Sequence, residues 1–121
     1  MRVRCIRLAR HDGTPVESSS WLTLGRVYGV LEVVVDGERW LVRIVGDAPN
    51  GVALFRLDEF AILSAVVPGS WTVNWHNARL LILGPAAWQK PGFWERYLDQ
   101  DPEAMRVFDE ECRRVVNSEG P

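Results

Sequence analysis

The sequence predicts a single α+β domain in which residues 1–84 are mainly β and residues 85–116 form a helical tail. Three observations support this prediction. A chain of 121 residues with 47% hydrophobic side chains can bury one core but not two. Short stretches rich in β-branched and aromatic residues, separated by turn-forming residues, fill the first two thirds of the chain. After Pro91 the apolar residues recur at helical spacing instead.

The first strand is expected over residues 2–8. Val3 and Cys5 share one face of this segment, whereas Ile6 and Leu8 share the other. The change of phase predicts a bulge or a change of burial near Cys5. A polar connection, residues 11–20, follows this strand and contains turn formers.

A hairpin comes next. Residues 27–35 are rich in β-branched side chains and apolar on both faces, and Asp36-Gly37 is a dipeptide that a tight type I′ turn prefers. The return strand alternates, with Trp40, Val42 and Ile44 on one face and arginines on the other. The remaining β region is expected as a loop over 46–51, strands over 52–55, 60–67, 71–75 and 80–83, and one 3₁₀ turn over 57–60.

This order of short strands, a hairpin, a longer loop, a 3₁₀ turn and a final short strand is typical of a small SH3-like β-barrel. The hairpin over 71–83 is additional, and we expect it to extend one sheet of the barrel. The fold predicted is therefore an SH3-like barrel with an extra hairpin, followed by a helical tail packed on the barrel.

In the tail, Pro85 to Lys90 is expected to form one short turn, and Pro91-Gly92 opens a helical segment. In this segment one face is apolar, formed by Phe93, Trp94, Tyr97 and Leu98. Asp101 is a good N-cap for the last helix, and Pro102 suits its first position. An apolar stripe on this helix consists of Met105, Phe108, Cys112, Val115 and Val116, and residues 117–121 are expected to fray.

The sequence predicts no catalytic residue, no metal site and no cofactor. It contains no GxGxxG, Walker, HExxH or GxSxG pattern. His11 and Asp12 are adjacent in a turn-rich loop, and His76 lies in a turn where we expect it to be exposed. Cys5 and Cys112 lie on apolar faces, so both are expected to be buried small hydrophobic residues rather than nucleophiles.

The net charge of −2 is distributed unevenly. Residues 1–11 contain four arginines and no acid. Between residues 95 and 111 two arginines stand against seven acids, Glu95, Asp99, Asp101, Glu103, Asp109, Glu110 and Glu111. The two ends either offset each other as solvated faces, or the acidic end is a docking surface for a basic partner. An acidic protein repels phosphate backbones, which argues against nucleic-acid binding.

The sequence predicts neither a membrane segment nor a secretion signal. The longest apolar stretch without a charge, residues 61–78, ends before Arg79 and is interrupted by Pro68-Gly69 and by polar residues. The N-terminus carries arginines but no following apolar run. We therefore expect a soluble cytoplasmic protein.

Six tryptophans carry most of the information about binding. Trp40, Trp71 and Trp75 fit inward strand positions and are expected to fill the core. Trp88 and Trp94 either attach the tail to the barrel, or one of them is an exposed anchor for a partner beside the acidic run. The candidate partner-binding residues are therefore Trp88, Trp94, Asp99, Asp101, Glu103 and Glu110.

Several motifs together resemble a group of small, mostly uncharacterised bacterial proteins. These motifs are Leu22-Thr-x-Gly25-x-x-Tyr28-x-Val30, Leu54-Phe55 with Phe60, Pro68-x-x-Trp71, Pro91-Gly-Phe-Trp-Glu-x-Tyr97 and Asp99-x-Asp-Pro-Glu-Ala104. Some of these proteins look like immunity proteins of polymorphic toxin systems. The resemblance implies a non-catalytic protein that binds and neutralises a toxin.

Two further function classes stay open. An SH3-like module that binds a peptide, or assembles in a larger bacterial complex, predicts a groove lined by Tyr28, Trp40 and other aromatics. An enzyme or ligand carrier would require a deep pocket with perturbed titratable groups. We expect a protein partner in preference to either a substrate or a nucleic acid.

Overall fold

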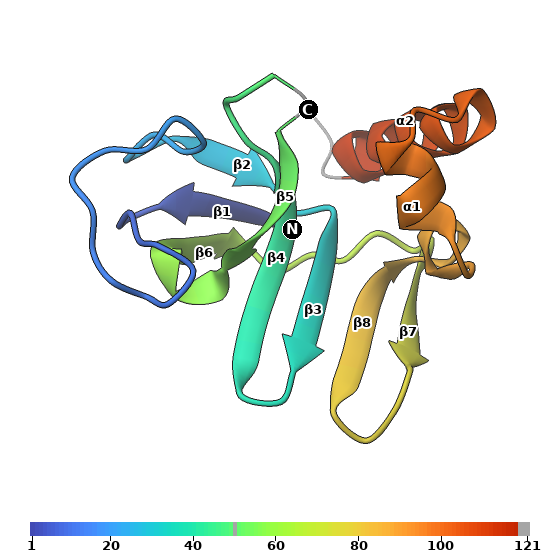
Figure 1. The fold of residues 1–121 in the computed structure, drawn as a ribbon, viewed down its shortest axis with the longest axis horizontal. Coiled ribbons are helices and arrows are strands. Elements are labelled where there is room, and N and C mark those ends of the chain that lie inside the picture. Colours follow the sequence, from blue (N-terminus) through green and yellow to red (C-terminus); the bar gives the residue numbers. More distant parts are fainter. Residues whose placement is uncertain (50, 119–121) are drawn as a thin grey trace.

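The computed structural model describes residues 1–49 and 51–118, and it confirms the α+β class (Figure 1). The strands are β1 (Arg2–Cys5), β2 (Val27–Gly29), β3 (Glu32–Asp36), β4 (Arg39–Val45), β5 (Val52–Arg56), β6 (Phe60–Ser64), β7 (Trp71–Trp75) and β8 (Leu80–Pro85). The helical elements are η1 (Leu57–Glu59), η2 (Ala86–Gln89), α1 (Phe93–Leu98) and α2 (Pro102–Ser118). None of the described helices is long and apolar enough to cross a membrane.

The strands form two antiparallel sheets. One has the order β2-β1-β6 and the other the order β5-β4-β3-β8-β7. The second hairpin, β7–β8, extends the larger sheet as predicted, because β8 pairs with β3. The expected first strand is shorter than predicted and ends at Cys5, since the amides of Ile6 and Arg7 both donate to the carbonyl oxygen of Glu59. The register shift lies between Arg2 and Val3, not near Cys5. The expected change of burial does occur after Cys5, because Cys5 and Leu8 are both buried although they are three residues apart. The expected strand over 60–67 likewise ends early, at Ser64.

The segment predicted as one strand over 27–35 is divided between the two sheets. Val30 and Leu31, both buried, separate β2 from β3. The Val30 amide donates to the carbonyl oxygen of Met1 beside β1, and the Leu31 amide donates to that of Arg43 in β4. The chain thus passes from one sheet to the other within two residues. Between the sheets lies the β part of the core, which includes Val3, Cys5, Val30, Val42, Ile44, Phe60 and Trp71.

Two hairpins project from this framework, β3–β4 and β7–β8 (Figure 1). Trp40 and Trp75 lie on them and are 56% and 71% exposed, so the prediction that they fill the core is wrong. Trp71, at the other end of β7, is buried as predicted. The alternation placed all three side chains on the correct face, but it carries no information on where the opposing layer ends.

The helical tail packs around one aromatic cluster. Trp88 stacks on Phe108 with ring centroids 5.1 Å apart and meets Trp94 edge-on at 5.5 Å. Phe93 and Tyr97 complete the cluster. Asp101 caps α2 as predicted, because its Oδ2 accepts the Ala104 amide at 3.0 Å.

Two residues expected on the apolar faces of the tail lie outside the core. Leu98 is 74% exposed, and Met105 is exposed as well. Phe108 and Val115 are buried and Cys112 is half-buried, so these three members of the predicted stripe are confirmed. The side chain of Val116, its last member, lies outside the described part of the structure. The helix continues to Ser118, beyond the point where fraying was expected, and residues 119–121 lie outside the described residues.

A buried carboxylate joins the tail to the larger sheet. Glu32 accepts one hydrogen bond from Arg43 Nε at 2.9 Å and another from Gln89 Nε2 in η2, also at 2.9 Å. The Arg43 guanidinium lies 3.8 Å above the ring of Trp94 in α1. Burial raises the pKa of Glu32 and outweighs the opposing effect of Arg43. Glu32 and Arg43 therefore contact both helical elements from the sheet.

Candidate functional site

A groove of about 580 Å³ follows the outer edge of β5, and we call it the β5 groove. Ala53, Leu54, Phe55 and Arg56 all line it. Because successive strand residues point to opposite faces, a groove that touches four in a row follows the edge of the strand. The other lining residues are Ala9, Arg10, His11, Ser19, Trp21, Leu22, Arg39, Leu41 and Glu59.

One wall of the groove is the connection over residues 6–26, and Glu59 holds it in place. The carbonyl oxygen of Glu59 accepts the amides of Ile6 and Arg7, and its side-chain Oε1 accepts the amide of Ala9 at 3.1 Å. The carboxylate is almost completely buried, and burial raises its pKa. Glu59 therefore anchors the wall from inside the protein.

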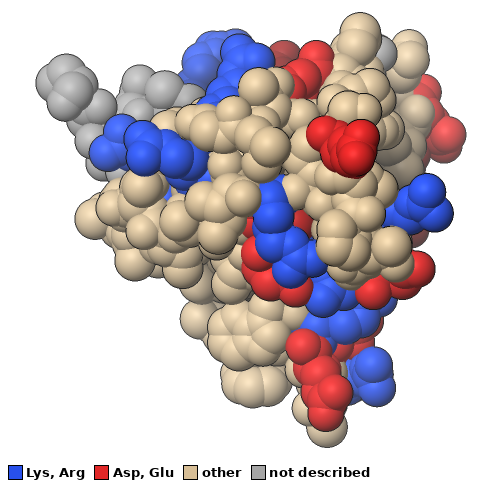
Figure 2. Space-filling model, turned by 90° about the vertical axis from the view of Figure 1, so that its left-hand side faces the viewer, with Lys and Arg blue, Asp and Glu red and all other residues tan. Residues whose placement is uncertain are grey.

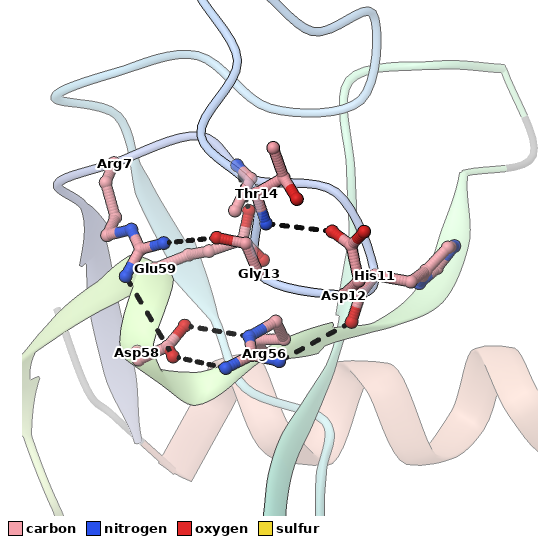
Figure 3. Close-up of polar contacts among 9 residues, drawn as sticks. Arg7, His11, Asp12, Gly13, Thr14, Arg56, Asp58 and Glu59 are labelled. Atoms are coloured by element: carbon pink, nitrogen blue, oxygen red, sulfur yellow. Dashed lines mark hydrogen bonds and ion pairs between the residues drawn. The ribbon is translucent and has the colours of Figure 1, made fainter.

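A network of ion pairs fixes the tip of the same wall (Figure 3). Arg56 donates to Asp58 through Nη2 at 2.7 Å, and Arg7 Nη1 lies 4.0 Å from the same carboxylate. Arg7 also donates to the carbonyl oxygen of Gly13 at 3.0 Å. Arg56 holds the pKa of Asp58 below its usual range. The network therefore links the turn around Gly13 to η1.

His11 and Asp12 form part of this turn, as the sequence predicted. Asp12 Oδ1 accepts the amide of Thr14 at 2.8 Å, and Gly13 has a positive φ of 89°. The ring of His11 points away from the Arg56–Asp58 pair (Figure 3). The two side chains therefore do not converge on a common point.

The groove combines cations with aromatic surface. Arg10 and Arg39 line it, and neither makes an ion pair within residues 1–49 and 51–118. Trp21 is 42% exposed and meets Phe55 edge-on, with ring centroids 6.3 Å apart. Seen from the side of the connection, charges of both signs lie in a band beside a broad uncharged area (Figure 2). The arginines of this side therefore do not form a continuous basic surface.

The residues predicted to bind a partner are dispersed over the tail. Trp88 is only 2% exposed, so it cannot be the predicted contact, whereas its alternative role of attaching the tail agrees with the structure. Trp94 is half-buried beneath Arg43. Asp101 serves as the helix cap. The other three are acids nearer the surface: Glu110 accepts from Arg106 at 2.8 Å, and Asp99 and Glu103 are exposed.

Of the two residues named for the aromatic groove of an SH3-like module, one is buried and the other is exposed. Tyr28 is buried, and its hydroxyl accepts the Thr23 amide and donates to Asp47. Trp40 lines a smaller hollow of about 210 Å³ next to the β5 groove, and the two share Arg39, Leu41 and Arg56. Trp21, Phe55 and Arg39 were missed as site residues. The one available signal was Trp21, a tryptophan beside a polar connection.

The two thiols are not nucleophiles in this structure. Cys5 is buried, and burial raises its pKa. Burial also raises the pKa of Cys112 to about 12. A thiol with a raised pKa holds its proton at neutral pH and does not attack. Across the described part of the chain, no three His, Cys, Asp or Glu side chains are grouped so as to hold a metal ion.

No family model matches the chain, and neither a curated protein nor a solved structure matches it.

Proposed function

We propose that this chain is a non-catalytic protein-binding domain built on an SH3-like barrel, and that a segment of its partner binds in the β5 groove. The observation that carries the proposal is the groove itself, which combines a strand edge, an exposed tryptophan and two arginines that form no ion pair with any described residue. Such a groove suits a peptide better than a small substrate, because it is open and is lined by apolar, aromatic and charged groups, whereas sites for small substrates are usually enclosed.

The connectivity supports the barrel part of the proposal. In chain order there is a strand, a long connection, a strand that passes from one sheet to the other, a hairpin, a 3₁₀ turn and a strand that returns to the first. β6 pairs with β1, which brings the two ends of this path together. This is the order expected of a small SH3-like barrel, with β7–β8 and the tail added after it.

The charged groups of the groove support binding rather than acid–base chemistry. Glu59 uses its carboxylate to hold the Ala9 amide, and Asp58 is occupied by Arg56. These acids shape the wall. Arg10, Arg39 and Trp21 are left to contact a partner, and tryptophan and arginine are the side chains most often found at the centre of protein interfaces.

A display library of random peptides tests this function. Selection on the immobilised protein should enrich peptides that bind to it. Trp21→Ala should lower the affinity for these peptides about tenfold, since aromatic anchors contribute much of the binding energy of an interface. Trp75→Ala is the matched control, because Trp75 is equally an exposed tryptophan but lies on β7 at the other edge of the sheet. Failure to enrich any peptide, or equal effects of the two substitutions, would refute the function.

A second candidate is the immunity-type function implied by the resemblance, and one observation favours it. Leu98 is strongly exposed beside Asp99, with Glu95 and Glu103 exposed on the same tail. An apolar side chain surrounded by carboxylates suits a basic partner surface. Co-expression with the product of the adjacent gene tests it: suppression of toxicity should require Glu95, Asp99 and Glu103, but not Glu17 and Glu38, which are exposed acids elsewhere.

A further inference from the structure

We propose that the segment bound in the β5 groove is acidic and extended, and that it pairs with β5 as an additional strand. This inference rests on the proposed function and specifies the chemistry of the partner.

The first argument is the free edge of β5. The strand lies at one end of the larger sheet and pairs with β4 alone. Among the described residues, the backbone of Ala53, Leu54 and Phe55 has no hydrogen-bond partner other than β4. In an antiparallel sheet, alternate residues of an edge strand point their N–H and C=O groups outward, where an extended segment can pair with them. The groove lies along this edge, so the space for such a segment exists.

The second argument is charge. Three arginines line the groove, against one acid, Glu59, which is buried and holds the Ala9 amide. Arg56 is neutralised by Asp58, but Arg10 and Arg39 make no ion pair in the described residues. Carboxylates on the partner would complement these two groups, and lysines or arginines on it would be repelled by them.

The third argument is the alternation of the two walls. In β5, Leu54 and Arg56 share one face, and Arg56 is paired with Leu41, on the same face as Arg39. Ala53 and Phe55 share the other face, and Phe55 contacts Trp21. A strand added here points successive side chains to these two faces in turn. The favoured segment therefore alternates acidic with apolar side chains.

Fluorescence anisotropy with labelled synthetic peptides long enough to span β5 tests the proposal. A peptide of alternating glutamate and valine should bind. Two matched peptides should bind about tenfold more weakly: one with lysine in place of glutamate, and one N-methylated on the backbone edge that would face β5. A higher salt concentration should weaken the binding of the glutamate peptide, because salt screens the attraction between opposite charges.

Protein variants locate the effect. Arg39→Glu should lower the affinity for the glutamate peptide about tenfold and raise the affinity for the lysine peptide, because the substitution reverses one charge of the groove. Arg4→Glu is the matched control: Arg4 is exposed on β1, outside the groove lining, and its reversal should leave both affinities unchanged. Thermal unfolding of both variants verifies that they fold.

The possible outcomes separate this inference from the proposed function. Equal binding of the lysine peptide, or equal effects of Arg39→Glu and Arg4→Glu, would overturn the acidic chemistry. Equal binding of the N-methylated peptide would overturn strand pairing. In both cases Trp21-dependent peptides from the display library would still support the proposed function. An empty display selection would refute both.

Discussion

The carboxylates of this chain occupy environments that the sequence alone does not distinguish. Glu32 and Glu59 are buried and hydrogen-bonded, and burial raises the pKa of each. Asp47 is bonded to Thr23, Tyr28 and Arg26, and these bonds lower its pKa. Each carboxylate joins segments that are distant in sequence. These three carboxylates therefore connect distant segments of the chain, Glu32 and Glu59 from buried positions and Asp47 from the surface, which a count of charges along the tail would not indicate.

Asp101 offers a test at this scale. Asp101→Ala removes the acceptor for the Ala104 amide, and loss of an N-cap costs about 1 kcal/mol of unfolding free energy. Asp99→Ala is the control two residues earlier, exposed and outside the cap, and it should change stability by less than about 0.5 kcal/mol. Urea denaturation followed by circular dichroism measures both. Equal losses would show that the carboxylate does not cap α2.

At the level of the elements, the projecting hairpins show that two side chains on the same face of a strand can differ in burial. Trp71 and Trp75 lie on the same face of β7, yet only Trp71 is covered by the rest of the protein. Both residues read alike in the sequence, because the period of two reports the face and not the opposing layer.

The two tryptophans therefore predict different costs. Trp71→Ala should lower the free energy of unfolding by about 3–5 kcal/mol, as truncation of a buried aromatic does. Trp75→Ala should lower it by less than about 1 kcal/mol, since an exposed side chain gains little from folding. Chemical denaturation of the two variants measures both free energies of unfolding. A large loss at Trp75 would mean that the β7–β8 hairpin is covered in solution.

Local patterns predicted elements better than they predicted their assembly. The hairpin turn at Asp36-Gly37, the 3₁₀ turn near Leu57 and the Asp101 cap depend on neighbouring residues, and each is present. The hairpin turn is not of type I′, because Gly37 has a positive φ of 62° whereas Glu38, the second turn residue, does not. The division of residues 27–35 between two sheets depends on hydrogen bonds to Met1 and Arg43, which no local pattern records. The assignment of these residues to the two sheets therefore depends on long-range pairing, which the periodicity of the sequence does not predict.

At the scale of the whole molecule, the same reason explains why the β5 groove was not predicted. Its lining comes from the first connection, from β4 and from β5 with η1, three segments that meet only through sheet pairing and through Glu59. The sequence favours the tail as the site, because aromatic and acidic residues are adjacent there. In the structure the aromatic residues of the tail pack against one another, and Trp88 is buried at the centre of this aromatic cluster.

Global stability should depend on pH through the buried acids. A carboxyl group whose folded pKa is raised contributes stability that is lost as pH rises from the unfolded value, 4.5 for Glu32 and Glu59, through the folded value. Asp12, Asp47 and Asp58 have lowered pKa values, so their contribution is lost as pH falls from 3.8, their unfolded value, through their lower folded values. Stability should therefore be greatest in weakly acidic solution and decline towards neutral pH.

Glu32→Gln isolates the more deeply buried of the two acids behind this decline. The amide does not ionise, so the fall in unfolding free energy above pH 4.5 should become shallower, with Glu59 supplying what remains. At low pH, where Glu32 is protonated, the variant should be close to the wild type, because both then present a neutral acceptor to Arg43 and Gln89. Urea denaturation across this pH range measures the slope, with exposed Glu17→Gln as the control. A slope in Glu32→Gln equal to that of the wild type would place the pH dependence elsewhere in the molecule.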